Sequence, residues 1–241
     1  MSHFNVAVIH REDQSIDELL EPYDENTEVE PYIDYTKQMA IEYARRNYAG
    51  HSEVLPADAT DEQCWKYMAE DYEADRIDGD GNLYTTYNPK SKWDWWTIGG
   101  RWSGLIKTKD GETVDECRIG EMDLTPDQDA YNHALRFWDV YVDKRPLKPG
   151  ETEEQYNTFY RESYFKDRYL DRETYAKCQA SFMTRAVVTP DGEWHEAGEM
   201  GWFGCSSETD EEWRDWAENY QKNFIDSADP DLVITMVDCH I

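Results

Sequence analysis

The chain has 241 residues, enough for one large domain with its own hydrophobic core. Its 53 Asp and Glu against 24 Lys and Arg give a formal net charge of −29. This acidity argues against direct nucleic-acid binding, which requires Lys and Arg to displace counterions from the phosphates. Ten Trp and seventeen Tyr argue against disorder, because disordered chains are poor in aromatic residues.

The cysteines lie far apart and show no C-x-x-C spacing typical of zinc or redox sites. The first ten residues lack the basic start of a secretory signal, and no apolar run reaches transmembrane length. We therefore expect an intracellular protein with free thiols and no membrane span.

Strand-forming residues occupy both ends of the chain. His3–Ile9 is rich in β-branched side chains, and Asp231–His240 follows Pro230, which discourages continuation of a preceding helix. These two runs predict one sheet that draws on both termini. We predict an α+β fold, a single domain over residues 1–241, with a central mixed or antiparallel sheet and helices packed on it.

Apolar residues at helical spacing predict several helices between the two end strands. The clearest, over 206–224, begins with possible N-cap residues and carries an aromatic stripe typical of a core face, formed by Trp213, Trp216, Tyr220 and Phe224. Asp191-Gly192 between two apolar runs predicts a hairpin over 183–195. The other predicted helices cover 35–48, 61–72, 128–141 and 152–164. Segments 22–34 and 142–175 are charged and are interpreted as possible lids or partner-facing insertions.

The most distinctive segment is Lys92–Trp102, with the sequence KWDWWTIGGRW. Gly99 and Gly100 permit a sharp turn that would bring Arg101 back beside Asp94 and the indoles. There Arg101 can stack on an indole or bind a phosphate or carboxylate; alternatively it pairs with Asp94 while the indoles fill the core. The motif matches neither a P-loop nor a dinucleotide fingerprint. Its candidate ligand-binding residues are Asp94, Trp95, Trp96, Arg101 and Trp102.

A second candidate is the glycine-rich segment Gly198–Gly204, which contributes Glu199 and Trp202 to the proposed ligand site. Glu199 can serve as an acid, a base or a hydrogen-bond acceptor. Alternatively the segment is a tight connection into the helix that follows.

Asp238 and His240 are two positions apart and share one face of the last strand. If the end strands pair, His3 joins them in a cluster suited to a divalent metal or to acid–base chemistry; alternatively this is a solvated chain end. No spacing motif supports a metal, so no metal site or cofactor is assigned. Asp78–Asn82 begins like a calcium loop, but Pro89 occupies the position of the closing Glu, so we predict a turn.

Several segments together carry a resemblance that spans most of the chain: Met1–Ile9, Pro22–Asn26, Tyr87–Trp102 and Gly198–Gly204. They resemble an uncharacterised family of proteins encoded by tailed bacteriophages, mainly those of actinobacteria, and by prophages. The resemblance implies a virus-encoded protein that acts in the cytoplasm of the infected bacterium. It implies no particular chemistry.

We expect a non-enzymatic binder or inhibitor, serving counter-defence or host takeover, that captures a host protein or a small anionic ligand near Trp95, Arg101 and Trp202. Three alternatives remain open: an acidic mimic of nucleic acid, a minor virion component, and a metal-dependent hydrolase or nucleotide-modifying enzyme. The enzyme would use Asp94, Glu199, Asp238 and His240.

Overall fold

The computed structural model describes residues 2–51, 54–73, 76–201 and 205–241. The chain forms two compact units. The sheet unit comprises Met1–Asp24 and Ser91–Ile241, and the small unit comprises Glu25–Lys90. No helix in the described residues is long and apolar enough to cross a membrane.

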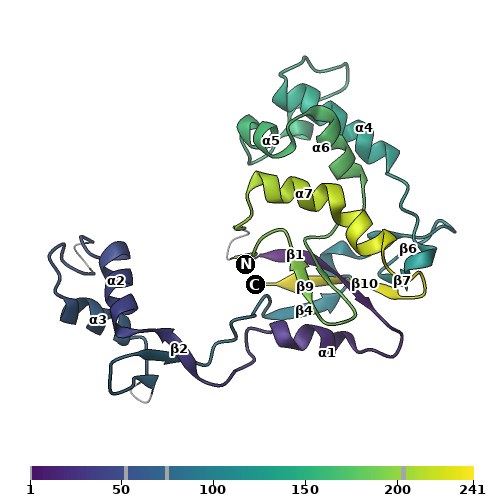
Figure 1. Cartoon of the computed structure of the whole chain (residues 1–241). Helices are drawn as coiled ribbons and strands as arrows, with labels where there is room; N and C mark the ends of the chain where they lie inside the picture. The colour runs from purple at the N-terminus through teal and green to yellow at the C-terminus, as the bar shows by residue number, and fades with distance from the viewer. Residues whose placement is uncertain (1, 52–53, 74–75, 202–204) are drawn as a thin grey trace. The chain divides into compact units, whose positions relative to one another are not determined.

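A six-stranded mixed sheet forms the centre of the sheet unit (Figure 1). Its two long strands are the first and last of the chain, β1 (His3–His10) and β10 (Val233–His240), which pair antiparallel over their full length. Beyond the last pair, the backbones of Ser2 and Ile241 exchange two hydrogen bonds of 3.0 Å. The predicted α+β fold, with a sheet containing both terminal strands, is confirmed.

Shorter strands extend the sheet on both sides. β8 (Ala186–Val188) runs parallel to β1, and β9 (Trp194–Glu196) pairs antiparallel with β8. The predicted hairpin is therefore present, with Gly192 at a φ of 83° in its turn. On the other side, β4 (Trp95–Ile98) and β7 (Glu116–Arg118) pair with different parts of β10.

The two faces of the sheet are covered by different helices (Figure 1). One face, here called the α7 face, packs against α7 (Asp210–Tyr220) and the π-helical turn Gln221–Asp226. The opposite α1 face packs against α1 (Ile16–Leu20). The α7 face contributes Ala7, Ile9, Val187, Ile234 and Met236 to the core; the α1 face contributes Val6, Val8, Ala186, Val188 and Val237.

Helix α7 follows the predicted pattern, with Thr209 as its N-cap in a capping box with Glu212. Trp216, Tyr220 and Phe224 fill the core of the α7 face. Trp213 instead contacts the aromatic core of the next helical layer. The aromatic stripe therefore joins two layers.

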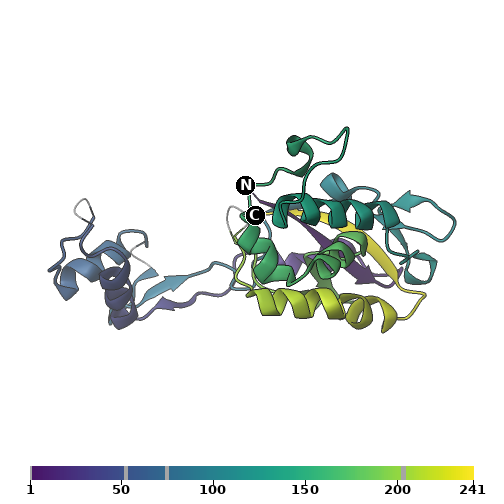
Figure 2. The same cartoon turned by 90° about the horizontal axis from the view of Figure 1, so that it is seen from above.

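Helices α4 (Gln128–Phe137), α5 (Glu162–Tyr169) and α6 (Arg172–Ala180) form that layer beyond α7 (Figures 1 and 2). Its core is aromatic and includes Phe137, Trp138, Phe165, Tyr169 and Tyr175. Helix α4 was predicted and continues into a π-helical turn, Trp138–Val142.

The predicted helix over 152–164 is wrong. Only one 3-10 turn, Glu153–Tyr156, forms there, and α5 begins at Glu162. Tyr156 and Phe165 enter the same core although they are nine positions apart. In one continuous helix they would lie about two and a half turns apart, on opposite sides. Burying both requires the break between them.

The small unit holds a two-stranded sheet, β2 (Tyr32–Tyr35) with β3 (Leu83–Thr85), and the predicted helices α2 (Lys37–Asn47) and α3 (Asp61–Ala69). Its core contains Ile41, Ala44, Leu55, Ala59 and Cys64. The calcium-like segment is a turn, as predicted, because a carboxylate oxygen of Asp78 accepts hydrogen bonds from two backbone nitrogens of that same segment.

Two glycines shape the exit from β4, before the short hairpin of β5 (Ile106–Lys107) and β6 (Thr113–Val114). Gly99 and Gly100 have φ values of 67° and 54°. A Cβ on Gly100 would clash with Oδ2 of Asp238. The predicted sharp turn is confirmed, and it packs against β10.

We predict that Gly100→Ala destabilises the fold by about 2–4 kcal/mol, because it adds a clash with a buried carboxylate to the strain of a positive φ. Gly111→Ala is the matched control: Gly111 has a φ of 90°, but no atom lies within 4 Å of its added Cβ. The control is expected to lose only about 1 kcal/mol. The free energy of unfolding of both variants is measured by urea denaturation. An equal decrease in the two variants would contradict the close packing of Gly100 on Asp238.

Candidate functional site

The α7 face turns from apolar to polar at the end where β1 begins and β10 finishes. Residues opposite each other on paired strands share a face. In this register His3 faces His240, and Asn5 faces Asp238. On the other side of β10, Trp95 and Thr97 of β4 face the same two β10 residues. We call the group the two-histidine site; it consists of His3, Asn5, Asp94, Trp95, Thr97, Asp238 and His240.

Each histidine of the site is tied to one carboxylate. Nδ1 of His3 lies 2.9 Å from Oδ1 of Asp238, and Nδ1 of His240 lies 2.6 Å from Oδ1 of Asp94. The two imidazole rings lie edge to face, with centroids 4.9 Å apart. The end of the sheet therefore holds two adjacent histidine–carboxylate pairs.

The hydrogen bonds define which ring nitrogens are available. An ionised carboxylate can only accept, so both Nδ1 atoms must donate, and in a neutral ring Nε2 then carries the lone pair. Neither Nε2 of His3 nor Nε2 of His240 has a hydrogen-bond partner among the described residues. The two Nε2 atoms are therefore the ring nitrogens left for a ligand, although His240 as a whole is only 6% exposed.

Asp238 is the most constrained group of the site, with only 2% of its surface exposed. Its Oδ1 bonds to His3, and its Oδ2 accepts a hydrogen bond of 3.0 Å from the backbone nitrogen of Arg101. A buried carboxylate is costly unless such partners satisfy it. The turn at Gly100 supplies the backbone nitrogen of Arg101 as the partner of Oδ2. This contact fixes the orientation of the carboxylate that holds His3.

Trp95 forms the aromatic wall of the site. Its ring stacks on His240 at a centroid distance of 5.5 Å and meets the edge of His3 at 5.4 Å. Trp95 is nevertheless 43% exposed. It therefore supports both imidazoles and keeps apolar surface open to solvent.

Other predicted site residues are distributed more widely. The alternative in which Arg101 pairs with Asp94 is wrong, because Asp94 binds His240 and the exposed Arg101 forms no side-chain ion pair within the described ranges. Trp96, next to Trp95 in β4, packs on the α1 face, as strand alternation requires. Trp102 is half-buried in the core of the α7 face.

Glu199 belongs to a different group of charges. Its Oε1 lies 3.1 Å from Nζ of Lys92, which also lies 2.8 Å from a carboxylate oxygen of Glu196 in β9. No hydrogen bond or ion pair links Glu199 to the two histidines in the described structure. Trp202 lies outside the described residues. Asn5 and Thr97 were not predicted as site residues, because only the strand register places them opposite Asp238.

The cluster of His3, Asp238 and His240 forms as the sequence suggested, but as hydrogen-bonded pairs. Among the residues that the structure describes, no group of three or more His, Cys, Asp or Glu side chains is arranged to hold a metal ion. Cys239, between two members of the site in sequence, points to the α1 face. Burial, with a smaller contribution from Asp238, raises the pKa of its thiol, so it is not a reactive thiolate.

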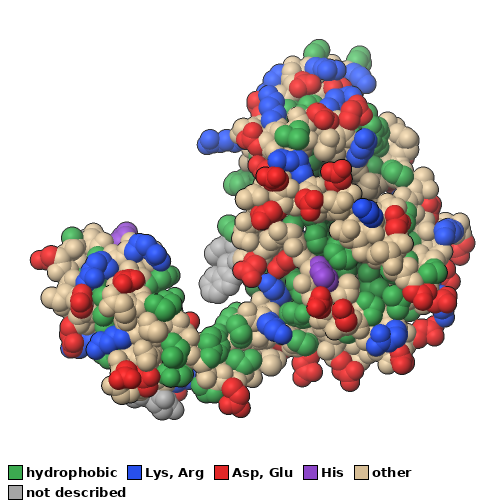
Figure 3. Space-filling view, in the orientation of Figure 1, with side chains coloured by type: hydrophobic (Ala, Val, Ile, Leu, Met, Phe, Trp, Pro, Cys, Tyr) green, Lys and Arg blue, Asp and Glu red, His purple; other side chains and the backbone are tan. Residues whose placement is uncertain are grey.

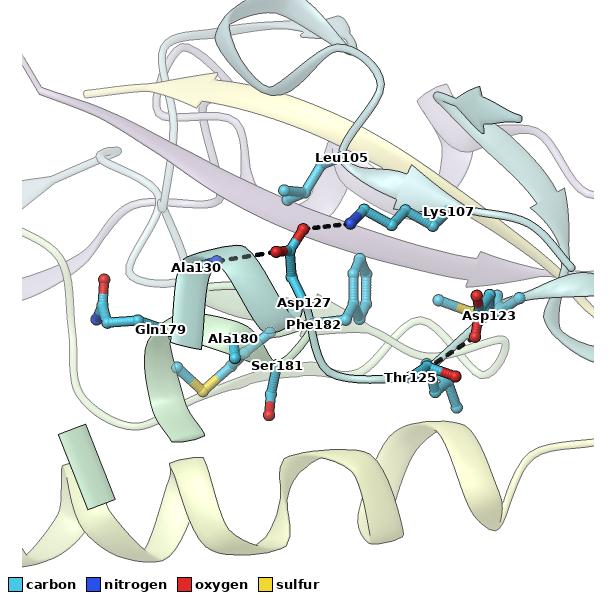
Figure 4. A pocket seen from close by; sticks show the side chains of 13 residues that line it. Leu105, Lys107, Asp123, Thr125, Asp127, Ala130, Gln179, Ala180, Ser181 and Phe182 are labelled. Atoms are coloured by element: carbon cyan, nitrogen blue, oxygen red, sulfur yellow. Dashed lines mark hydrogen bonds and ion pairs between the residues drawn. The ribbon is translucent and has the colours of Figure 1, made fainter. Parts of the chain in front are cut away.

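A cavity of about 200 Å³ lies elsewhere in the sheet unit, between β5, α4 and the end of α6 (Figure 4). Its charged groups already have partners within the fold: Lys107 lies 2.5 Å from Asp127, and Asp127 also caps α4 through the backbone nitrogen of Ala130. Asp123 accepts from the backbone of Thr125. This cavity therefore offers mainly apolar surface, and the two-histidine site is the stronger candidate for chemistry.

No family model matches the chain, and neither the curated proteins nor the solved structures yield a match.

We predict that neutral His3 and His240 both carry their proton on Nδ1, because each Nδ1 donates to a carboxylate. Nitrogen NMR of the imidazole rings measures this directly. The exposed His133, which has no carboxylate partner among the described residues, serves as the control and should show mixed tautomers. A proton on Nε2 of neutral His3 or His240 would contradict the two pairs.

Proposed function

We propose that the two-histidine site binds a small anionic ligand that also carries a flat ring, and that the chain serves a tailed phage as an accessory protein inside the infected bacterium. The observation that carries this proposal is the pair of oriented Nε2 atoms beside the half-exposed Trp95. The phage context follows from the resemblance of the sequence. The binding role follows from the chemistry of the site.

Each part of the site suits one part of a nucleotide. The open surface of Trp95 can stack on a base, an interaction worth about 1–3 kcal/mol. The Nε2 atoms accept hydrogen bonds from sugar hydroxyls when the rings are neutral and donate to phosphate oxygens when they are protonated. Arg101, whose backbone nitrogen contacts Asp238, supplies an exposed guanidinium for a phosphate. A nucleotide is therefore the ligand class that best fits the site.

The alternative of nucleic-acid mimicry requires acidic side chains gathered on one face. On the face seen in Figure 3, acidic and basic side chains are interspersed over both units. That face offers no continuous acidic surface of the kind mimicry requires.

A second candidate function, binding of a host protein, has its own observation. Phe159 is 96% exposed and Leu170 is 63% exposed, both in the segment 142–175 of the helical layer. That segment carries seven Lys and Arg and eight Asp and Glu, so it is far less acidic than the whole chain. Contiguous exposed apolar surface is typical of partner surfaces, and Phe159 contacts the ring of its neighbour Tyr160, which is 51% exposed. Cross-linking in host lysate tests this function: a partner lost in Phe159→Ala but kept in Trp95→Ala would support it.

We predict that adenosine 5′-monophosphate binds the full chain more tightly than inorganic phosphate does, because only the nucleotide can stack on Trp95. Calorimetry should show that Trp95→Ala lowers the affinity for the nucleotide by about tenfold, matching the stacking free energy. Arg101→Ala should lower the affinity for both ligands. Arg161→Ala, which removes an exposed arginine of the helical layer, should change neither affinity. If purine and pyrimidine monophosphates neither bind nor raise the unfolding temperature, the proposal fails.

A further inference from the structure

We infer that the two-histidine site also cleaves a phosphodiester bond of a nucleotide by acid–base catalysis without a metal ion. This inference rests on the proposed ligand class. It adds a reaction to the binding function and assigns His3 and His240 as the catalytic residues.

The orientation of each ring supports a role in proton transfer. A carboxylate on Nδ1 fixes the tautomer and stabilises the positive charge that the ring gains when Nε2 takes up a proton. The structure contains this arrangement twice, through Asp238 for His3 and through Asp94 for His240. One such pair can act as a base or as an acid; two pairs with rings 4.9 Å apart can perform both roles on one substrate.

The reaction balances with water as the only co-reactant. Nε2 of the neutral imidazole takes a proton from water while the water oxygen forms a bond to phosphorus. Nε2–H of the other, protonated imidazole gives its proton to the leaving oxygen while the bond between that oxygen and phosphorus breaks. The products are a phosphomonoester and an alcohol. Proton exchange with solvent then restores the starting state of both rings.

With one ring protonated, the two carboxylates and one imidazolium leave a net charge of −1. The exposed side chain of Arg101, whose backbone nitrogen contacts Asp238, is the cation that would have to offset this charge for an anionic diester to bind. Asp238 is held in place from both oxygens, so it orients His3 without being free to attack phosphorus. Cys239 faces the opposite side of the sheet. Proton transfer by the imidazoles is therefore the chemistry that the described residues support here.

The test uses the full chain with excess EDTA and two substrates, bis(p-nitrophenyl) phosphate and cyclic di-AMP. We expect turnover in the presence of EDTA. His3→Gln and His240→Gln should each lower kcat for cyclic di-AMP, whose leaving sugar oxygen needs a proton, at least about 100-fold, and the double variant should lose little more than either single variant, because the two rings act as a unit. His133→Gln, which alters an exposed histidine of the helical layer, should retain full turnover.

Binding of adenosine 5′-monophosphate, measured on the same samples, separates this inference from the proposed function. Asp94→Asn keeps the shape of the side chain and its hydrogen-bond acceptor but removes the charge, so it should lower kcat by a larger factor than it lowers the affinity for the nucleotide. This variant also tests the inference if a histidine variant does not fold. Nucleotide binding without turnover by the wild-type chain would overturn the inference and leave the binding function intact. Turnover only after a divalent metal is added would overturn it as well. Loss of both binding and turnover would refute both proposals.

Discussion

The antiparallel pairing of β1 with β10 is the interaction on which the rest of the sheet unit depends. It joins the two ends of the chain along eight residues of each strand and buries both strands at the centre of the sheet. Every other strand of this sheet pairs directly with one of them or, like β9, through β8. The same pairing sets His3 opposite His240, so the candidate site forms only when the chain ends have met. Folding of the sheet and assembly of the site are thus one event.

The buried carboxylate of Asp238 is the second constraint. Both of its oxygens need partners, and the fold supplies His3 on one side and the backbone of Arg101 on the other. The second contact is possible only because Gly100 lacks a Cβ. The distinctive tryptophan-glycine segment therefore has two structural roles: Trp95 covers the imidazoles, and the glycine turn holds Asp238. Arg101 contributes its backbone to the fold and keeps its side chain exposed.

Much of the fold could be predicted because it depends on local patterns. β-branched runs marked the end strands, an Asp-Gly turn marked the β8–β9 hairpin, and aromatic spacing marked α7. The predicted helix over 152–164 was wrong because Tyr156 and Phe165 enter the same core, although they would lie on opposite sides of one continuous helix. Helix α6 was also missed, although Asp171 caps its first turn.

The candidate site was only partly predictable, since its key pairs join residues far apart in sequence. The grouping of His3 with Asp238 and His240 follows from pairing the end strands. The bond between Asp94 and His240 depends on β4 lying beside β10, which no local signal indicates. Because side chains alternate along a strand, the sequence could have placed Trp95 and Trp96 on opposite faces of the sheet, and the structure places them so. Glu199 lies with Lys92 because of the loop geometry after β9, which composition does not determine.

The most direct test of the central claim is an NMR titration of the full chain with adenosine 5′-monophosphate that follows the ring signals of all six histidines. If the nucleotide binds beside the two histidines, His3 and His240 shift together and saturate with a single dissociation constant, while His10, at the opposite end of β1, and His133 do not shift. Ligand-induced shifts confined to other histidines, or no shifts at concentrations where the ligand is bound, would contradict a nucleotide site at the meeting point of the chain ends.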